Sequence, residues 1–225
     1  MISHKYKCIF IHIPKCAGTS IENALGHLDG HTGRGGQDHR NIRRYEQPLL
    51  TKDTFLSYEN IYEALRRIHL QYFGKVHNPN NKLTVTARQY REYYKFTIVR
   101  NPWERAFSWY KAVMRDEITK NNLRISGQLS FNDALRIFVG KGLLRPQTYW
   151  IKDFSGSIPL DYIGRFENLS NDFKKICNAM GAPNITLPHK LKGTKDDYRL
   201  YYNEKSKEYI KKIYKEEIEL FDYSF

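Results

Sequence analysis

The chain has 225 residues, of which 40% are hydrophobic and 27% are charged, values that exclude a wholly disordered protein. Its three cysteines are odd in number and form no CxxC pair, which excludes a disulfide framework and the usual zinc sites and indicates a reducing compartment. A net charge of +13 favours an anionic ligand. We therefore expect residues 1–225 to fold as a single domain around an apolar core.

No stretch of the sequence is typical of a membrane span. The longest apolar run covers residues 8–13, whereas a helix that crosses a bilayer needs roughly 20 residues. The run is also too short, and too near the first residue, for a signal peptide. We therefore expect a cytoplasmic protein without a membrane span.

Apolar periodicity and turn residues predict an alternation of strands and helices. In chain order they predict a strand over 8–13, a helix capped by Thr19 or Ser20, helices over 58–73 and 86–93, a strand over 94–100, a helix from Pro102, a helix over 131–139, a strand over 161–166, a helix that ends before Gly181, and a helix over 204–220. Strands that alternate with helices indicate an α/β domain with a mainly parallel sheet.

The first junction between a strand and a helix has the residues of an anion site. Lys15 supplies a mobile positive charge, Gly18 lets a ligand approach the backbone, and Thr19 and Ser20 add hydroxyl donors. The lysine precedes the glycine, whereas in the nucleotide-triphosphate pattern GxxxxGK[ST] it follows the second glycine directly. The junction therefore favours an anion other than a metal-bound triphosphate.

A second junction repeats this arrangement. Arg100 stands at the carboxyl end of the strand over 94–100, where ligands collect in open α/β sheets. Ser108 lies roughly two helical turns further on, and Arg105 shares its helix face. Two anion sites, each at the carboxyl end of a strand, fit a nucleotide that carries charged groups at both ends.

The sequence resembles the sulfotransferases that use 3′-phosphoadenosine 5′-phosphosulfate (PAPS), in particular the carbohydrate type and its soluble bacterial members. The resemblance rests on "IPKCAGTS" (13–20) followed by "IVRNPWERAFSWY" (98–110). It continues in "RPQTYWI" (145–151), "YIGRFENLSNDF" (162–173) and the closing "YIKKIYKEEIELFDYSF". It implies a P-loop-like three-layer fold, in which helices flank a mainly parallel central sheet.

The same resemblance implies the activity. Such enzymes move the sulfuryl group of PAPS to a hydroxyl or amine of a carbohydrate or other small acceptor and release adenosine 3′,5′-bisphosphate, with no metal and no nucleic-acid partner. Arg100 and Ser108 are then expected to hold the 3′-phosphate, and Arg165 is a further candidate for the nucleotide. The loop expected to hold the 5′-phosphosulfate consists of Lys15, Cys16, Ala17, Gly18, Thr19 and Ser20, with Lys15 stabilising the leaving oxygen.

A hydroxyl acceptor also requires a general base, for which histidine is the usual residue. His77 is the first candidate, because some relatives of the family place their base in the comparable segment. His39 and His31, in the glycine-rich stretch 26–48, are rivals, and an aspartate or glutamate remains open.

Two other functions are compatible with the sequence. A small-molecule kinase of the P-loop type would bind ATP and magnesium, although the position of the lysine speaks against it. A non-catalytic module that binds nucleic acid or another polyanion would explain the charge, although no nucleic-acid-binding motif is visible.

Overall fold

The computed structural model describes residues 1–31, 33–188 and 196–225. Its centre is a four-stranded sheet in the order β1-β2-β3-β4. The strands are β1 (Ile2–Ser3), β2 (Cys8–Ile11), β3 (Tyr94–Val99) and β4 (Tyr162–Arg165). β1 pairs with β2 in antiparallel fashion, whereas β2, β3 and β4 are mutually parallel. The predicted α/β class with a mainly parallel sheet is confirmed.

The register of the parallel strands brings their carboxyl ends to one edge. Phe10 lies opposite Phe96, and Val99 lies opposite Arg165. β2 is buried along its whole length and β3 from its second residue onward, as expected for strands that are covered on both faces. The two loops that the sequence singles out, after β2 and after β3, therefore start side by side.

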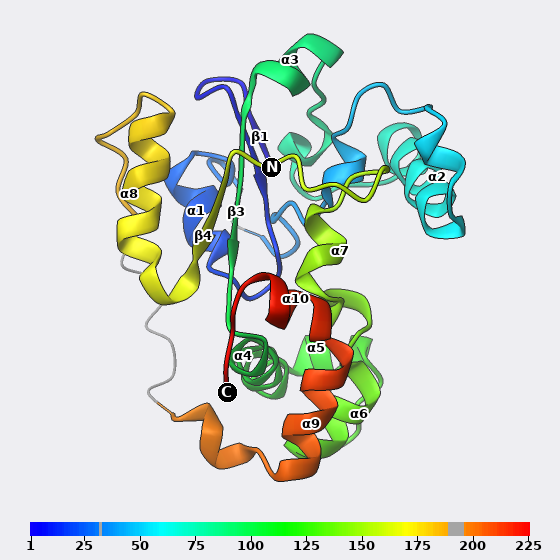
Figure 1. The fold of residues 1–225 in the computed structure, drawn as a ribbon, viewed down its shortest axis with the longest axis vertical. Coiled ribbons are helices and arrows are strands. Elements are labelled where there is room, and N and C mark those ends of the chain that lie inside the picture. The colour runs from blue at the N-terminus through cyan, green and yellow to red at the C-terminus, as the bar shows by residue number, and fades with distance from the viewer. Residues whose placement is uncertain (32, 189–195) are drawn as a thin grey trace.

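Helices cover both faces of the sheet. Figure 1 shows the sheet nearly edge-on, with α1 and α8 on one side and α7 and α2 on the other. These helices are α1 (Gly18–Ala24), α2 (Tyr58–Tyr72), α7 (Gln147–Ile151) and α8 (Leu169–Ala179). The short α3 (Ala87–Glu92), opened by a Thr86–Gln89 capping box, leads into β3.

A second group of helices lies beyond the carboxyl edge of the sheet (Figure 1). It comprises α4 (Pro102–Met114), α5 (Glu117–Asn122), α6 (Phe131–Phe138), α9 (Glu204–Ile213) and α10 (Lys215–Leu220). Asn101 caps α4 by accepting hydrogen bonds from the backbone of Trp103 and Glu104, and Pro102 occupies its first turn. Trp103 packs edge-on against Phe225 within an aromatic core.

Most predicted elements are present within one or two residues of their expected bounds, and two differences remain. The helix expected over 204–220 is interrupted at Tyr214 and forms α9 and α10. The sequence analysis did not predict β1, α5 or α7. No helix in the described ranges is long and apolar enough to cross a membrane.

Candidate active site

Two residues of the loop between β2 and α1 adopt the left-handed backbone conformation. Lys15 and Ala17 both have positive φ, 70° and 63°, a conformation that non-glycine residues rarely adopt. Ala17 is the N-cap of α1, and its carbonyl accepts hydrogen bonds from the N–H groups of Ser20 and Ile21. The expectation that Thr19 or Ser20 caps the helix is therefore wrong, because both residues lie inside it.

This backbone leaves a concave set of N–H donors. Across the described part of the chain, the N–H groups of Ala17, Gly18 and Thr19 donate to no protein acceptor. They open at the amino end of α1, where the helix dipole is positive. Successive N–H groups in such alternating conformations form an anion-binding hollow. This backbone is able to hold an anion, and the binding of phosphate by the loop stays a prediction.

A neighbouring side chain leaves no room for any residue larger than glycine at position 18. A Cβ atom at this position would lie 1.9 Å from Cδ2 and 2.0 Å from Nε2 of His12. The imidazole cannot move away easily, because its Nδ1 is 2.9 Å from Oε1 of the buried Glu22. Burial alone would raise the pKa of Glu22, but the adjacent His12 lowers it overall, so the carboxylate remains ionised.

Lys15 lies partly buried in a positively charged environment. Burial lowers the pKa of its ammonium group, and the nearby charges of Arg100 and Arg115 lower it further. Each of these effects disfavours the charged form of Lys15 as long as no anion is bound. A bound anion would relieve the repulsion among the three cations, so this cluster is electrostatically prepared for a ligand with more than one negative charge.

Arg100 joins the two predicted anion sites. It follows β3 directly, and its Nη1 donates a hydrogen bond of 3.0 Å to the carbonyl oxygen of Lys15. Its Nη2 donates to Glu104 at 2.9 Å, and the guanidinium stacks 3.8 Å from the centre of the Phe166 ring. Its buried Nε has no hydrogen-bond partner in the described ranges. Arg100 thus supports the loop and retains one donor.

Ser108, the other residue predicted for the 3′-phosphate, lies partly buried in α4, one turn beyond Glu104. Within the described part of the chain its hydroxyl makes no hydrogen bond to the protein. The structure therefore brings Lys15 and Arg100 into contact, whereas the role of Ser108 stays a prediction.

Gln147 links Arg100 to helix α10 through hydrogen bonds. No pattern in the sequence marks it as a site residue. Its side-chain carbonyl accepts from the backbone N–H of Arg100 at 2.9 Å, and its amide donates to the carbonyl of Arg100 at 2.8 Å. Both its backbone N–H and its side-chain amide donate to Glu217 of α10. Burial raises the pKa of Glu217 to about 7. Only the family resemblance distinguishes the motif "RPQTYWI" in the sequence, since nothing in its spacing indicates this contact.

Cys16 does not have the role predicted for it. Its thiol is buried and contacts the side-chain carbonyl of Gln147 at 3.5 Å, while its N–H donates to the carbonyl of Ile13. Burial raises the pKa of the thiol to about 12, so it stays protonated and unreactive. Cys16 is therefore a packing residue beneath the loop, with neither group free for a ligand.

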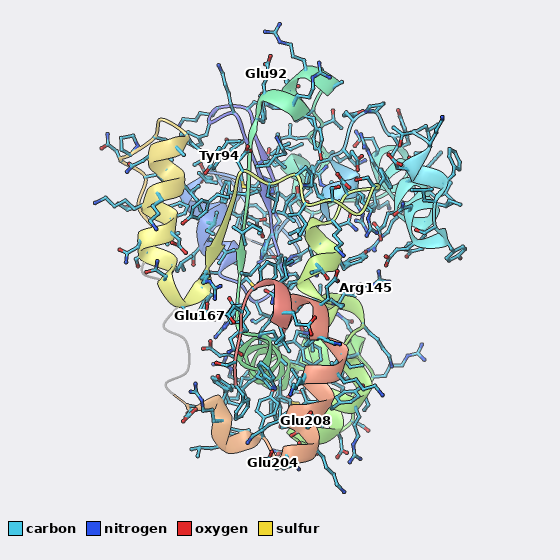
Figure 2. The ribbon with its side chains drawn as sticks, viewed as in Figure 1. Glu92, Tyr94, Arg145, Glu167, Glu204 and Glu208 are labelled. Carbon is cyan, nitrogen blue, oxygen red and sulfur yellow. The ribbon has the colours of Figure 1, made fainter. Side chains whose placement is uncertain are left out.

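Arg105 and Arg165, which the sequence predicts near the site, both donate hydrogen bonds to backbone carbonyl groups of the protein. Arg105 is fully buried and donates to the carbonyl oxygens of Pro14, Leu143 and Arg145, so it holds the loop after β2 against the segment before α7. Arg165 donates to the carbonyl of Phe221 and lies over the Tyr223 ring. Figure 2 labels two residues near the carboxyl edge of the sheet. Glu167 follows β4, and Arg145 precedes α7 on the opposite side of the sheet.

The histidine candidates occupy two different positions. The ring of His39 lies 4.1 Å from that of His12, and its Nδ1 is 3.4 Å from the His12 carbonyl, three residues before Lys15. Burial and the proximity of His12 lower the pKa of His39 to about 3, so its imidazole is neutral. His77 is exposed and lies against Gly35, and His31 lies against Gly36 in the same loop. His39 is thus the candidate tied most directly to the strand that carries the phosphate loop.

A cavity of about 210 Å³ opens beside His39. It is strongly basic, because its walls include four arginines and one acid, Asp38. Its lining comprises Gln37, Asp38, His39, Arg40, Arg44, Arg66, Arg67, Leu70, Gln71, Val76, Asn81 and Thr84. The amides and cations in this set suit a polar ligand with hydroxyl and acidic groups.

The sequence matches the sulfotransferase family over residues 1–224. The chain belongs to the sulfotransferase family. The match decides in favour of the predicted sulfotransferase enzyme over the kinase and the non-catalytic module, and it agrees with the P-loop-like architecture of the fold. Searches among curated proteins and among solved structures give no match. In the described ranges of this sulfotransferase, no group of three or more histidine, cysteine and acidic side chains is arranged to hold a metal ion.

Proposed function

We propose that the sulfotransferase uses PAPS as donor and transfers its sulfuryl group to a hydroxyl of a carbohydrate or other small acceptor, most plainly an acidic sugar, in the cytoplasm. The observation that carries the proposal is the loop at residues 15–19. There, unpartnered N–H donors, a helix amino end and Lys15 converge beside Arg100. The family supplies the reaction class, and the loop fits the phosphosulfate end of such a donor.

The chain's own residues supply electrostatic stabilisation in this mechanism. As the bond between sulfur and the bridging oxygen breaks, negative charge grows on the departing phosphate. The ammonium of Lys15 and the N–H groups of Ala17, Gly18 and Thr19 would stabilise it, and they need little reorganisation, because the loop is already fixed by Arg100 and Arg105. One such donor typically contributes a factor of about 10² to 10³ in rate.

The base is proposed to be His39. A neutral imidazole can accept the proton of the acceptor hydroxyl, and an anionic donor bound nearby would raise its low pKa toward the range in which a base works well. His39 also lines the basic cavity, where an acidic sugar would find arginine and amide partners. His77 and His31 remain the alternatives.

Thermal unfolding with adenosine 3′,5′-bisphosphate tests the donor site. A ligand at about 100 times its dissociation constant adds roughly 2.7 kcal/mol of stability, which raises the unfolding temperature measurably. We expect the bisphosphate to stabilise the protein and ATP with magnesium not to do so. Stabilisation by ATP with magnesium alone would contradict the proposal.

Lys15→Ala then separates binding from chemistry. In an assay with radiolabelled PAPS and a panel of acidic sugars, we expect this variant to lose about 10² to 10³ in turnover. The bisphosphate should still stabilise it, because the backbone donors remain. Lys5→Ala is the matched control, since Lys5 is an exposed lysine in the turn before β2; it should behave as the wild type.

A further inference from the structure

Several large apolar side chains of helix α2 face solvent instead of the protein core. Its buried residues are Asn60, Glu63 and Ala64. Asn60 donates to the carbonyl of Phe154 at 2.8 Å, and Glu63 accepts from Arg44 at 2.8 Å. Its outer face carries Tyr58, Tyr62, Leu65 and Tyr72, which recur at helical spacing. An amphipathic helix normally buries its apolar side, so this inverted arrangement calls for a partner outside the fold.

The neighbouring segments enlarge this surface. Eight large apolar or aromatic side chains between residues 50 and 73 are between 43% and 84% exposed. We call them the α2 apolar face; they are Leu50, Phe55, Leu56, Tyr58, Tyr62, Leu65, Tyr72 and Phe73. Figure 1 places α2 at the periphery of the molecule, away from the sheet. Large exposed apolar side chains on a helix and on the segments next to it are typical of interaction sites.

The charged residues around the α2 apolar face favour an anionic partner. Lys52, Arg66 and Lys75 are exposed beside it, and Glu59, the exposed acid of α2, already binds Arg43 and Arg145. The whole chain carries a net charge of +13. Two copies joined through this face would bring like charges together, whereas an anionic surface would be attracted.

We propose that the α2 apolar face docks the protein peripherally on a bilayer rich in anionic phospholipids. Tyrosine, phenylalanine and leucine side chains are suited to the boundary between headgroups and acyl chains, and flanking lysine and arginine bind acidic headgroups. A helix of 15 residues is about 22 Å long, which suits a helix lying in the plane of the interface. This inference is independent of the sulfuryl donor.

The position of α2 connects this face to the basic cavity. Arg66, Arg67, Leu70 and Gln71 line that cavity from the same helix that carries the apolar face. Arg67, Leu70 and Gln71 are half-buried and lie on the inward side of α2, opposite the apolar face. Docking would therefore hold the cavity about one helix diameter, roughly 10 Å, from the headgroups.

Flotation of the full chain with vesicles tests the proposal. One set of vesicles contains phosphatidylcholine alone, and the other also contains phosphatidylglycerol. We expect the protein to float with the second set only, and added salt to weaken the association. Failure to float with the anionic vesicles would overturn the proposal.

Substitution of the face identifies the residues responsible. The double variant Leu65→Ser/Phe73→Ser should reduce the partition onto anionic vesicles by on the order of tenfold or more, because two side chains no longer enter the interface. Leu200→Ser is the matched control, since Leu200 is 83% exposed on the short turn Tyr198–Tyr201; it should bind as the wild type.

Two results would assign the face to something else. If the double variant floats as well as the wild type, the α2 apolar face is not the docking surface. If light scattering shows a dimer that the double variant converts to a monomer, while vesicles bind neither protein, the occupant is a second copy of this chain. Tyr72→Ser is a smaller change at an exposed position and repeats the test with little risk to folding.

Discussion

Replacing Gly18 by alanine should destabilise both the fold and the phosphate loop. Gly18 lies within α1 and has no positive φ, so alanine would fit the backbone conformation there. The obstacle is space, because the new Cβ would lie 1.9 Å from the imidazole of His12. The ring can retreat only by giving up its 2.9 Å contact with Glu22, whose carboxylate would then be buried without that partner.

The size of the effect follows from these two contacts. Overpacking a well-filled interior costs about 1–3 kcal/mol, and a hydrogen bond to a charged group is worth about 1.5–3 kcal/mol. A loss of about 3 kcal/mol would lower the unfolding temperature of a chain of this length by about 6–12 °C. Stabilisation by adenosine 3′,5′-bisphosphate should weaken as well, because the N–H of residue 18 moves with the helix.

The assay is thermal unfolding of four variants: Gly18→Ala, Gly33→Ala, His12→Ala and the double variant His12→Ala/Gly18→Ala. Gly33→Ala is the control, because a Cβ there meets only His31 at an ordinary 3.5 Å; it should unfold close to the wild type. In the background of His12→Ala, the change Gly18→Ala should cost little, since the obstructing ring is gone. If Gly18→Ala alone unfolds at the wild-type temperature, or if its cost is the same with and without His12, the steric reasoning is wrong.

Three further predictions concern neighbouring groups. Arg105→Met should lower stability by about 3 kcal/mol, measured by urea unfolding, because the carbonyl groups of Pro14, Leu143 and Arg145 lose their donor; stability equal to that of the wild type would contradict this role. Burial raises the pKa of Glu217 from 4.5 to about 7, so the folded state binds the proton more tightly, and stability should fall as the pH rises through that window and then level off. Glu217→Gln should remove that part of the pH dependence, about 3 kcal/mol in all; an unchanged profile would show that Glu217 is not its source. In the transfer assay, His39→Ala should reduce turnover by about 10² or more, whereas His77→Ala should have little effect; the reverse result would assign the base to His77.

The sequence alone predicted the elements that depend on local patterns. Runs of apolar residues identified β2, β3 and β4, and Pro102 marked the start of α4. The sequence also predicted an anion site at the carboxyl end of each of two strands, and the two together fit one nucleotide that carries charged groups at both ends. The contact of Arg100 with the carbonyl of Lys15 agrees with that expectation.

Tertiary structure decided the contacts made between segments that are distant in the sequence. Gln147 bonds to Arg100 and Glu217 across 47 and 70 residues, and no local pattern records such a pairing. Helix α2 makes the same point, since periodicity identified the helix but not which side faces inward. Its orientation depends on Arg44 and on the Phe154 carbonyl, which satisfy its polar groups and so leave its apolar side in solvent. A sequence records which residues share a face of a helix, but only the packing of distant segments determines what that face meets.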